Sequence, residues 1–536
     1  MDQFFESVAG INDVINGIVW TKVGVWLLIA AGVLTTIITD FFQITHIRHW
    51  MKNTIGSLFH KDVIAHHKDN TAISPFQALC TALAATVGTG NIAGVSAAIC
   101  FGGAGAVFWM WIAAFFGMMT GYSEKVLAIY FRRRNKDGEW MGGPMYYLEN
   151  GLGSKKGCRG LGKVLAVLFA VFTVLASFGI GNMGQVNKIV ANIETAFTIS
   201  SLESITLFGN ITAYSLTIGI VLMILVAIIV IGGLQRIAAF AEKVVPFMVV
   251  MFVVGSLVVI GINYANILPA LKSIFVTAFN PIAATGGVVG YIIKVTMTQG
   301  FKRGIFSNEA GLGSSAMVHS NSNVKEPVKQ GMWGIFEVFV DTLIVCTMTA
   351  LVILTSGAYN LETGKIAQNL VDNGITDATL VGAAFNSVFS YGNFGQKFVA
   401  IALFLFAFTT ILGWSYYGSK AVEYLFGKTA KKVYGVLFTL MIVSGSVMTS
   451  SLAWDISDTF NGLMMAPNLV GIAVLAGLVR KITKNYKERK LENKQDVTPM
   501  LSAYPEIQAV QLKELRIDEA EEAEELAAEL ALKGKK

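Results

Sequence analysis

The chain has 536 residues, of which 54% are hydrophobic and only 14% carry a charge, with a net charge of +6; an average soluble protein has about 25% charged residues. So few charged side chains cannot cover a water-soluble protein of this size, and the same composition excludes disordered, collagen-like and disulfide-rich chains. We therefore expect the surplus apolar surface to face a lipid bilayer.

Eleven apolar stretches are long enough to cross a bilayer, which takes about 20 residues in a helix. In chain order they cover residues 23–43, 74–101, 104–131, 161–191, 213–231, 238–262, 286–317, 330–355, 398–425, 433–450 and 452–478. Lipid offers no partners to backbone polar groups, so these stretches must be helices. The sequence predicts an all-α, multi-pass membrane protein with residues 1–22 before the first span and a tail over 479–536.

Lys and Arg residues are distributed unevenly between the predicted loops. The loops after spans one, three, five, seven and nine carry twenty of them, and the loops on the other side carry four. Positively charged loops stay in the cytoplasm. The N-terminal segment 1–22 is therefore expected outside the cell (inner) membrane and the tail inside. The tail has a basic cluster over 480–490 and an acidic helical pattern over 512–536, and we expect it to be solvated.

Two predicted spans contain helix-breaking residues. Gly88-Thr89-Gly90-Asn91 lies in the middle of the second span, and the seventh contains Gly300 and Gly304, followed by Gly311 and Gly313. Such residues favour unwinding, which a membrane helix tolerates where the backbone lines a cavity. We expect the interruptions at Gly88/Gly90 and at Gly300/Gly304.

The two interrupted spans occupy corresponding places in the chain. Each opens a set of five spans, over residues 74–262 and 286–478, and an odd number of spans per set places the two sets in opposite membrane orientations. This is the layout of an inverted-repeat secondary transporter, whose substrate binds near the midplane. Half-helix N-termini offer N–H groups to an anion, while freed carbonyls offer oxygen to a cation. A zwitterionic amino acid and a sodium ion suit such a site.

Four segments resemble those of a known family. They are GGAGAVFWMWIAAFFG (102–117), ATVGTGNIAGV (85–95), WMGGPMYYLENGLG (140–153) and QGFKRGIFSNEAGLGSSA (299–316). They resemble the sodium:alanine symporters, also described as alanine or glycine:cation symporters, and the resemblance covers about residues 10–485. It implies one extra helix followed by a LeuT-like 5+5 inverted-repeat core with two discontinuous helices. It also implies sodium-driven uptake of alanine or glycine, with Na⁺ as coupling ion and no other cofactor.

The resemblance also implies which residues bind the substrate and the ion. The substrate carboxylate is expected at Thr89, Gly90 and Asn91. The sodium ion is expected between carbonyls of the second span and hydroxyls of the ninth, with the ligands Ala84, Val87, Phe406, Thr409 and Thr410. Two adjacent threonines in a helix, taken alone, are more typical of hydroxyls bonded to the preceding turn.

Further substrate contacts are expected from polar and aromatic residues at the same depth. Gln185 is the first candidate on the fourth span, with Asn182 and Asn187 as competitors. The remaining candidates are Phe301, Phe306, Ser307, Asn308 and Trp414. Bulky aromatic side chains would shrink the pocket to fit alanine or glycine, although helix packing explains any of these residues equally well.

Ionisable residues inside predicted spans are candidates for function. Glu337 and Asp341 are four residues apart on one helix face and suggest a proton relay, a second cation site or structural ion pairs. Their expected partners are Lys188, Lys294, Lys302 and Arg303. Asp455 and Asp458 leave the same alternatives open, and Glu309 suggests a cytoplasmic gate.

Other classes of function fit the sequence less well. The chain has six histidines, at positions 46, 49, 60, 66, 67 and 319, which we expect to be solvated or interfacial. It lacks HExxH, GxSxG and P-loop motifs, which argues against an enzyme or an ATP-driven pump. The alternatives are a proton-coupled symporter using Glu337 or Asp341, and a non-transporting amino-acid receptor or channel. We expect a monomer and no nucleic-acid partner.

Overall fold

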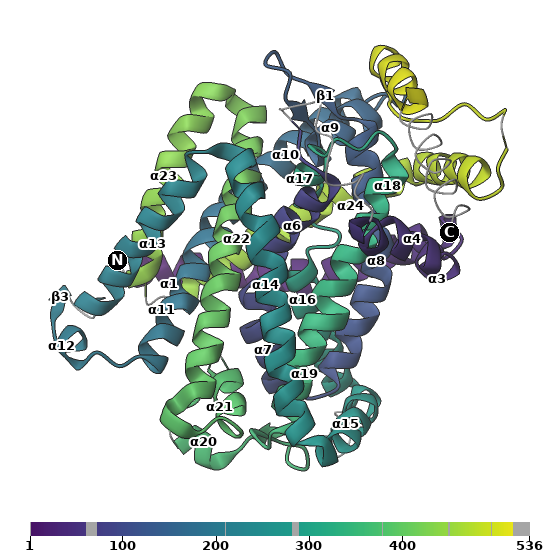
Figure 1. The fold of residues 1–536 in the computed structure, drawn as a ribbon. Coiled ribbons are helices and arrows are strands. Elements are labelled where there is room, and N and C mark those ends of the chain that lie inside the picture. Colours follow the sequence, from purple (N-terminus) through teal and green to yellow (C-terminus); the bar gives the residue numbers. More distant parts are fainter. Residues whose placement is uncertain are drawn as a thin grey trace, which may run out of the picture.

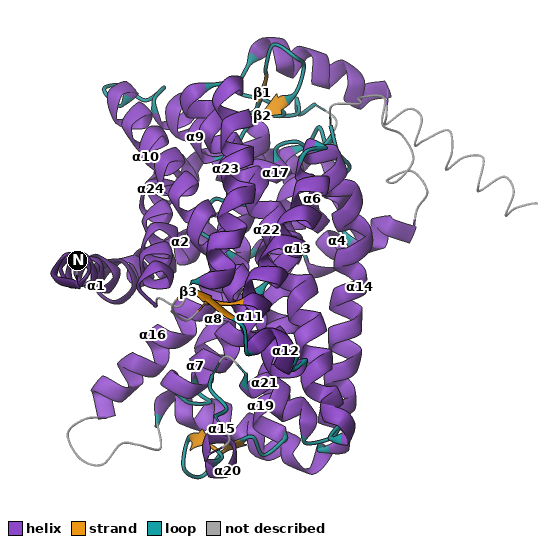
Figure 2. Cartoon of the chain, turned by 90° about the vertical axis from the view of Figure 1, so that its left-hand side faces the viewer, coloured by secondary structure: helices purple, strands orange, loops and turns teal. Residues whose placement is uncertain are grey.

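The computed structural model describes residues 2–59, 72–208, 211–280, 289–372, 374–377, 379–448, 451–494 and 496–517. Long helices lie side by side through the body of the molecule (Figure 1), and helix dominates the chain (Figure 2). The described strands form three short antiparallel pairs. These are β1 (Arg133–Arg134) with β2 (Trp140–Met141), β3 (Thr206–Phe208) with β4 (Ile211–Thr212), and β5 (Tyr359–Asn360) with β6 (Lys365–Ile366).

Most of the predicted spans are present as long apolar helices. Among the described residues, nine helices are long and apolar enough to cross a membrane, and one bent pair adds a tenth. Uninterrupted examples are α8 (Ala106–Tyr130), α13 (Ala213–Val230), α14 (Gly233–Ile262), α22 (Phe394–Phe426), α23 (Lys428–Val447) and α24 (Ser451–Lys490). A multi-pass membrane protein is confirmed, whereas the count of eleven is not.

Three spans of this set are built from consecutive helical pieces that include a π-helical turn. They are α1–η1–α2 (Asp2–Gly17, Ile18–Val23, Gly24–Ile38), α10–η5–α11 (Arg159–Phe178, Gly179–Met183, Gly184–Ala196) and α18–η7–α19 (Pro327–Val338, Phe339–Cys346, Thr347–Thr355). π-Helical turns are rare and occur frequently at functional sites. Two of them, η5 and η7, adjoin the residues discussed below.

Short helices occupy the two ends of the bundle. In Figure 1, α15 (Ile267–Phe279), α20 (Gln368–Asp372) and α21 (Leu380–Asn386) lie at one end, while α9 (Pro144–Tyr146) and α17 (Ala316–His319) lie toward the other. The remaining short elements are α3 (Phe42–Thr45), α4 (Ile47–Asn53), η2 (Ile55–Phe59), η4 (Tyr147–Leu152), α12 (Ser200–Glu203), η6 (Tyr264–Asn266) and η8 (Tyr391–Asn393).

The second predicted span is broken where the sequence predicts. Helix α6 (Pro75–Thr86) begins at a capping box formed by Ser74 and Gln77, and ends before Gly88. A π-helical turn, η3 (Gly90–Gly94), and α7 (Val95–Gly102) follow, and the two halves meet at a bend of 55°. Glycine and asparagine at the bend weaken the helix there, and the asparagine side chain replaces a helical partner, as described below.

The predicted break at Gly300 and Gly304 is wrong. Helix α16 (Val289–Asn308) runs through both glycines, and the chain leaves the helix at Glu309. Gly311 and Gly313 have φ values of +95° and +80°, a left-handed conformation that glycine adopts without a side-chain clash. Residues 309–315 therefore form the break, and α17 follows it.

The glycines inside α16 serve helix packing instead. A Cβ atom on Gly300 would lie 2.4 Å from the carbonyl oxygen of Ala106 on α8, so α16 and α8 approach too closely for any side chain at this position. Small residues at membrane-helix contacts commonly have this role. Helix α16 also carries three basic residues, Lys294, Lys302 and Arg303. It is not one of the nine apolar helices found among the described residues.

Both terminal segments contact the helical body. Asn16 of α1 donates a hydrogen bond to Thr459 Oγ1 of α24 at 2.9 Å. In the tail, Leu501 is buried and the Ala503 N–H donates to the Tyr130 carbonyl at 2.9 Å. The expectation of a solvated tail is therefore wrong for residues near 501–503, and the acidic pattern beyond residue 517 lies outside the described residues.

Candidate functional site

The first break exposes backbone oxygen at the end of α6. The N–H of Gly88 donates to the side-chain oxygen of Asn91 at 2.8 Å instead of to the Ala84 carbonyl, its partner in a continuous helix. Val87 leaves the helical conformation with ψ of 89°. The carbonyls of Ala84 and Val87, both predicted sodium ligands, thus lie where the helical hydrogen bonding ends.

The two predicted hydroxyl ligands lie on α22, and one of them directly faces this break. A Cβ atom on Gly88 would be only 2.4 Å from Thr410 Oγ1. The hydroxyls of Thr409 and Thr410 both donate to the Phe406 carbonyl, at 2.9 and 3.0 Å. Each hydroxyl oxygen keeps lone pairs for a cation, whereas the Phe406 carbonyl already accepts two hydrogen bonds.

Gln185 joins the first break from α11, next to the π-helical turn η5. Its Oε1 accepts a hydrogen bond from the Thr89 N–H at 3.3 Å, and its Nε2 donates to the Ile180 carbonyl at 3.0 Å. The hydroxyl of Thr89 is buried and has no hydrogen-bond partner among the described residues. The structure thus brings Gln185 next to Thr89, whose hydroxyl is an unused donor. Asn182 and Asn187, the competing candidates, instead donate to the carbonyls of Phe438 and Met448.

The end of α16 packs directly on the first break. A Cβ atom on Gly90 would lie 3.0 Å from the Phe306 ring and 3.2 Å from Ser307 Cα. Phe301 lies farther back along α16, where its ring centroid is 5.9 Å from that of Trp109. Asn308 donates to Thr342 Oγ1 at 3.0 Å and so ties α16 to the π-helical turn η7.

Trp414 is held in place by two contacts. Its indole N–H donates to Glu309 Oε1 at 3.0 Å, and Gly181 lies so close that a Cβ there would be 2.4 Å from the ring. Glu309 also accepts a hydrogen bond from Ser314. Its φ of 54° is unusual for a residue other than glycine. Glu309, the first residue of the second break, therefore contacts an aromatic side chain of α22, and among the described residues it pairs with no Arg or Lys that could form a charged gate.

Asp341 connects the two breaks, a contact that the sequence did not reveal. Its Oδ1 accepts a hydrogen bond from Asn91 Nδ2 at 2.6 Å, and its Oδ2 accepts hydrogen bonds from the hydroxyls of Ser307 and Thr342, both at 2.8 Å. All four side chains are buried. Asn91, a predicted substrate ligand, thus uses its side chain to hold the break, while its N–H donates to the Gly88 carbonyl and its carbonyl accepts from the Thr349 hydroxyl.

Glu337, one turn before Asp341, has different partners. Its Oε2 lies 3.1 Å from Lys125 Nζ and 3.1 Å from His319 Nε2, and all three side chains are buried. The partners expected from sequence are therefore wrong for Glu337. The expectation that His319 is solvated or interfacial is also wrong, because its exposed fraction is 0%. This histidine lies on α17, immediately after the second break.

A further buried carboxylate, Glu124 on α8, completes the contacts around the second break. Glu124 Oε1 accepts hydrogen bonds from the Gly311 N–H at 3.0 Å and from Asn468 Nδ2 at 2.7 Å. These contacts join α8, the 309–315 segment and α24. Lys302 forms an ion pair with Asp458 at 2.6 Å, between α16 and the start of α24, so it does not serve Glu337 either.

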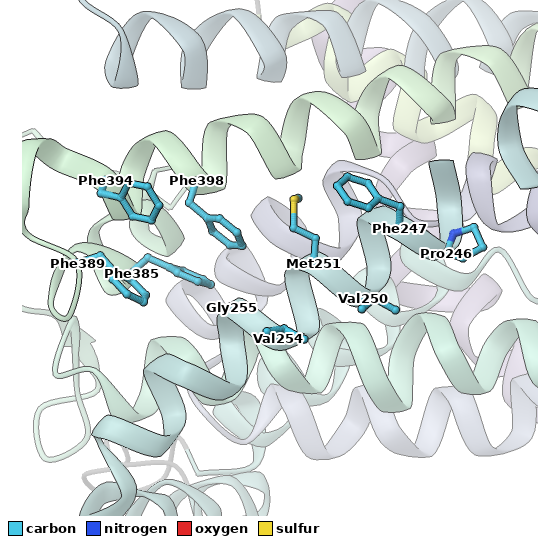
Figure 3. A pocket seen from close by; sticks show the side chains of 10 residues that line it. All are labelled: Pro246, Phe247, Val250, Met251, Val254, Gly255, Phe385, Phe389, Phe394 and Phe398. Atoms are coloured by element: carbon cyan, nitrogen blue, oxygen red, sulfur yellow. The ribbon is translucent and has the colours of Figure 1, made fainter. Parts of the chain in front are cut away.

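A separate apolar groove lies between α14 and the segment around α21 and the start of α22 (Figure 3). It has a volume of about 720 Å³, and five of its ten lining residues are phenylalanines. The lining residues are Pro246, Phe247, Val250, Met251, Val254, Gly255, Phe385, Phe389, Phe394 and Phe398. Phe247 and Val250 are each 61% exposed, as expected of side chains that face lipid. The groove offers almost no polar atoms, so it does not suit a zwitterionic amino acid.

Comparison with known proteins identifies the family. Residues 5–500 match the model of the sodium:alanine symporter family. The sodium/alanine symporter AgcS of Methanococcus maripaludis is 40% identical over 493 residues, which are 91% of this chain and 99% of that protein. The amino-acid carrier protein AlsT of Bacillus subtilis is 33% identical over 507 residues, which are 94% and 96% of the two chains.

One solved structure shows the fold. The crystal structure of MhsT in complex with L-phenylalanine superimposes with a TM-score of 0.50 and 14% sequence identity, covering 78% of this chain and 99% of that one. This likeness confirms the expected LeuT-like fold. The named relatives are transporters, not enzymes. From the match over residues 5–500 and the identity to AgcS over nearly its whole length, this chain belongs to the sodium:alanine symporter family.

Proposed function

We propose that this protein takes up alanine or glycine by symport with sodium, through alternating access around the first break. The observation that carries the proposal is the cluster of Gly88, Thr89, Gly90, Gln185 and Thr410. These residues combine backbone groups released from helical hydrogen bonding, whose N–H groups now donate to the side chains of Asn91 and Gln185, with hydroxyls in the interior of a membrane protein. Membership of the sodium:alanine symporter family supports the same conclusion.

The substrate carboxylate would bind the backbone N–H groups at the start of η3, taking over the Thr89 N–H from Gln185, and the Thr89 hydroxyl, which has no partner among the described residues. Half-helix N-termini favour anions through their unpaired N–H groups and the helix dipole. Gln185, whose Oε1 now accepts from the Thr89 N–H, would turn to the substrate as the carboxylate takes its place. Asn91 would contribute its backbone N–H, which now donates to the Gly88 carbonyl at 3.3 Å. Phe306, Ser307 and Trp414 would form the walls beside it, with Phe301 and Asn308 supporting them from behind.

Sodium would bind between α6 and α22. Its ligands would be the carbonyls of Ala84, Val87 and Phe406 and the hydroxyls of Thr409 and Thr410, which are the hard oxygen donors that a small cation needs. The ion would hold the break in its substrate-binding conformation. Sodium and alanine would then raise each other's affinity by the same factor, because binding linkage is reciprocal.

The wider organisation is proposed from the sequence. Residues 23–43 would form the extra helix, residues 74–262 and 286–478 the two inverted repeats, and residues 479–536 a cytoplasmic tail. The distribution of Lys and Arg supports an external N-terminus in the cell membrane. A monomer would suffice, since each group of the site comes from one chain.

Uptake of radiolabelled alanine into proteoliposomes tests the proposal. A sodium gradient should drive accumulation above equilibrium, whereas lithium or proton gradients of the same size should drive little. Accumulation that follows pH and ignores sodium would favour proton coupling. This alternative is relevant because a Bacillus subtilis relative, YrbD, 36% identical over 492 residues, is provisionally named a sodium/proton-dependent alanine carrier protein. Equilibration without accumulation would indicate a channel or receptor.

A further inference from the structure

The apolar groove of Figure 3 extends along only part of helix α14. Its lining residues on this helix run from Pro246 to Gly255, and Pro246 lies near the middle of α14. At 1.5 Å per residue, this stretch is about 14 Å long. The hydrocarbon core of a bilayer is about 30 Å thick, so the groove has the length of one leaflet.

The groove begins at one end of the helical bundle. Phe394 is the first residue of α22, and Phe389 lies in the connection between α21 and α22. Helix α21 lies at this end of the molecule (Figure 1). Tyr391, in the same connection, is 96% exposed, and tyrosine is typical of the level at which a bilayer meets water. The groove therefore runs from the membrane surface toward the middle of the bilayer, through the outer leaflet in the orientation proposed above.

The aromatic wall of the groove is formed by rings that support one another. The ring centroids of Phe385 and Phe398 are 5.1 Å apart, and those of Phe389 and Phe394 are 5.8 Å apart. Behind this wall, the fully buried Phe252 of α14 packs on Phe385 at 6.1 Å. Because the rings hold each other in place, the groove is preformed, which lowers the cost of binding a ligand.

The groove is also shaped by a glycine and is open to lipid. A Cβ atom on Gly255 would lie 2.5 Å from the Phe398 ring, so only glycine leaves room for the ring in this position. Val254, on the same helix, is 54% exposed. If the groove were empty, its side chains would lose the contacts that close packing supplies. A flexible hydrocarbon chain fits a narrow, almost wholly apolar site of this kind.

A basic side chain lies beside the surface end of the groove. Lys397 follows Phe394 by three residues on α22, so the two lie on the same side of the helix. Lys397 forms no ion pair with the described residues. A lysine near the membrane surface extends toward the headgroups and attracts anionic ones. Apolar walls with a cation at the surface match the two parts of an anionic phospholipid.

We propose that the groove is a binding site for one acyl chain of an anionic phospholipid of the outer leaflet, whose phosphate group lies beside Lys397. The acyl chain lies between α14 and α22 and packs against the rings of Phe385 and Phe398. This site goes beyond the proposed symport and does not depend on it.

Photo-crosslinking in reconstituted vesicles tests the site. The full-length protein is placed in vesicles of phosphatidylethanolamine that contain phosphatidylglycerol with a diazirine group in the middle of one acyl chain, and mass spectrometry of peptides locates the adducts. Adducts should form on groove residues such as Met251 and Phe398 about 10-fold more often than on the exposed face of α13, which meets ordinary lipid.

A substitution that fills the groove gives the matched comparison. Val254→Trp should lower the adducts on Met251 and Phe398 by about 10-fold. Val221→Trp, the same change on α13, is the control and should leave them unaltered. Val254 and Val221 are 54% and 51% exposed, so neither new side chain enters the packed interior.

The headgroup contact is tested separately. Lys397→Gln should reduce the preference of the groove for the phosphatidylglycerol probe over a phosphatidylcholine probe by about 5-fold. Lys272→Gln, at an exposed position on α15 at the same end of the bundle, should retain the preference. Equal preference in these two variants would overturn the phosphate contact at Lys397.

Three results would overturn the acyl-chain site itself. Adducts that are equally frequent on the groove and on α13 would show only ordinary contact with bulk lipid. Adducts that persist unaltered in Val254→Trp would place the bound chain elsewhere. A groove without adducts, in protein that light scattering shows to be a dimer, would assign the groove to a second copy of this chain.

Discussion

Replacing Gly88 with alanine tests the proposed sodium site most sharply. The new Cβ atom would lie 2.4 Å from Thr410 Oγ1 and 3.4 Å from Gln185 Oε1, so the first break and α22 must move apart. Overpacking of this kind costs about 1–3 kcal/mol. If the strain falls on the ion-bound state, sodium affinity should drop by about 5- to 150-fold.

The assay is alanine uptake into proteoliposomes at increasing sodium concentrations. Gly435→Ala is the matched control, because Gly435 lies inside α23 and an added Cβ there meets no atom within 4 Å. The reasoning predicts a large rise in the half-maximal sodium concentration for Gly88→Ala alone. Equal sodium dependence in both variants, with uptake intact, would show that the contact between Gly88 and Thr410 does not form part of the ion site.

Three further substitutions test other contacts. Thr410→Ala should weaken sodium affinity about 10-fold while Thr410→Ser retains it, and equal sodium titrations for the two variants would remove this hydroxyl from the site. Gly300→Ala should lower the free energy of unfolding by about 1–3 kcal/mol, because its Cβ would lie 2.4 Å from the Ala106 carbonyl oxygen. Thermal unfolding in detergent measures this loss. Lost alanine binding at unchanged stability would instead place Gly300 in the substrate site. Trp414→Phe leaves the buried Glu309 Oε1 without its donor, which should lower the free energy of unfolding by about 1–3 kcal/mol. Glu309→Gln should destabilise the protein less, because its amide oxygen still accepts the Trp414 hydrogen bond. Equal unfolding midpoints for the two variants would contradict that contact.

The fold class could be predicted from sequence because membrane spans are a property of composition. Apolar runs of sufficient length and sparse charge give the spans directly. The seventh span shows the limit of this reasoning. Its sequence favoured a break at Gly300 and Gly304, and only the approach of α8 at Gly300 and the positive φ at Gly311 show which glycines serve packing and which the break.

The first break was predictable in position, and part of its chemistry was not. The pattern Gly-Thr-Gly-Asn indicates a weak helix centre, but it cannot reveal that Asn91 bonds to Gly88 on one side and Asp341 on the other. Asp341 lies 250 residues away in sequence. Spacing along one helix linked it to Glu337, whereas tertiary packing gives the two carboxylates different partners.

Lys125 and Glu124 illustrate a missed signal. Both lie in the apolar run of α8 with exposed fractions of 1% and 0%, and an intramembrane charged pair is itself a reason to look for partners. They stand near the end of the predicted span 104–131, where charged side chains commonly reach the interface, so their position in the sequence alone does not show that they are buried.

Reciprocal binding of sodium and alanine to the purified protein tests the central claim most directly. The dissociation constant of alanine is measured with saturating sodium and with choline in its place, and that of sodium with and without alanine. Coupling through the first break predicts that each ligand tightens the other by the same factor, of about 10-fold or more. Alanine affinity that is the same in sodium and in choline would contradict the account.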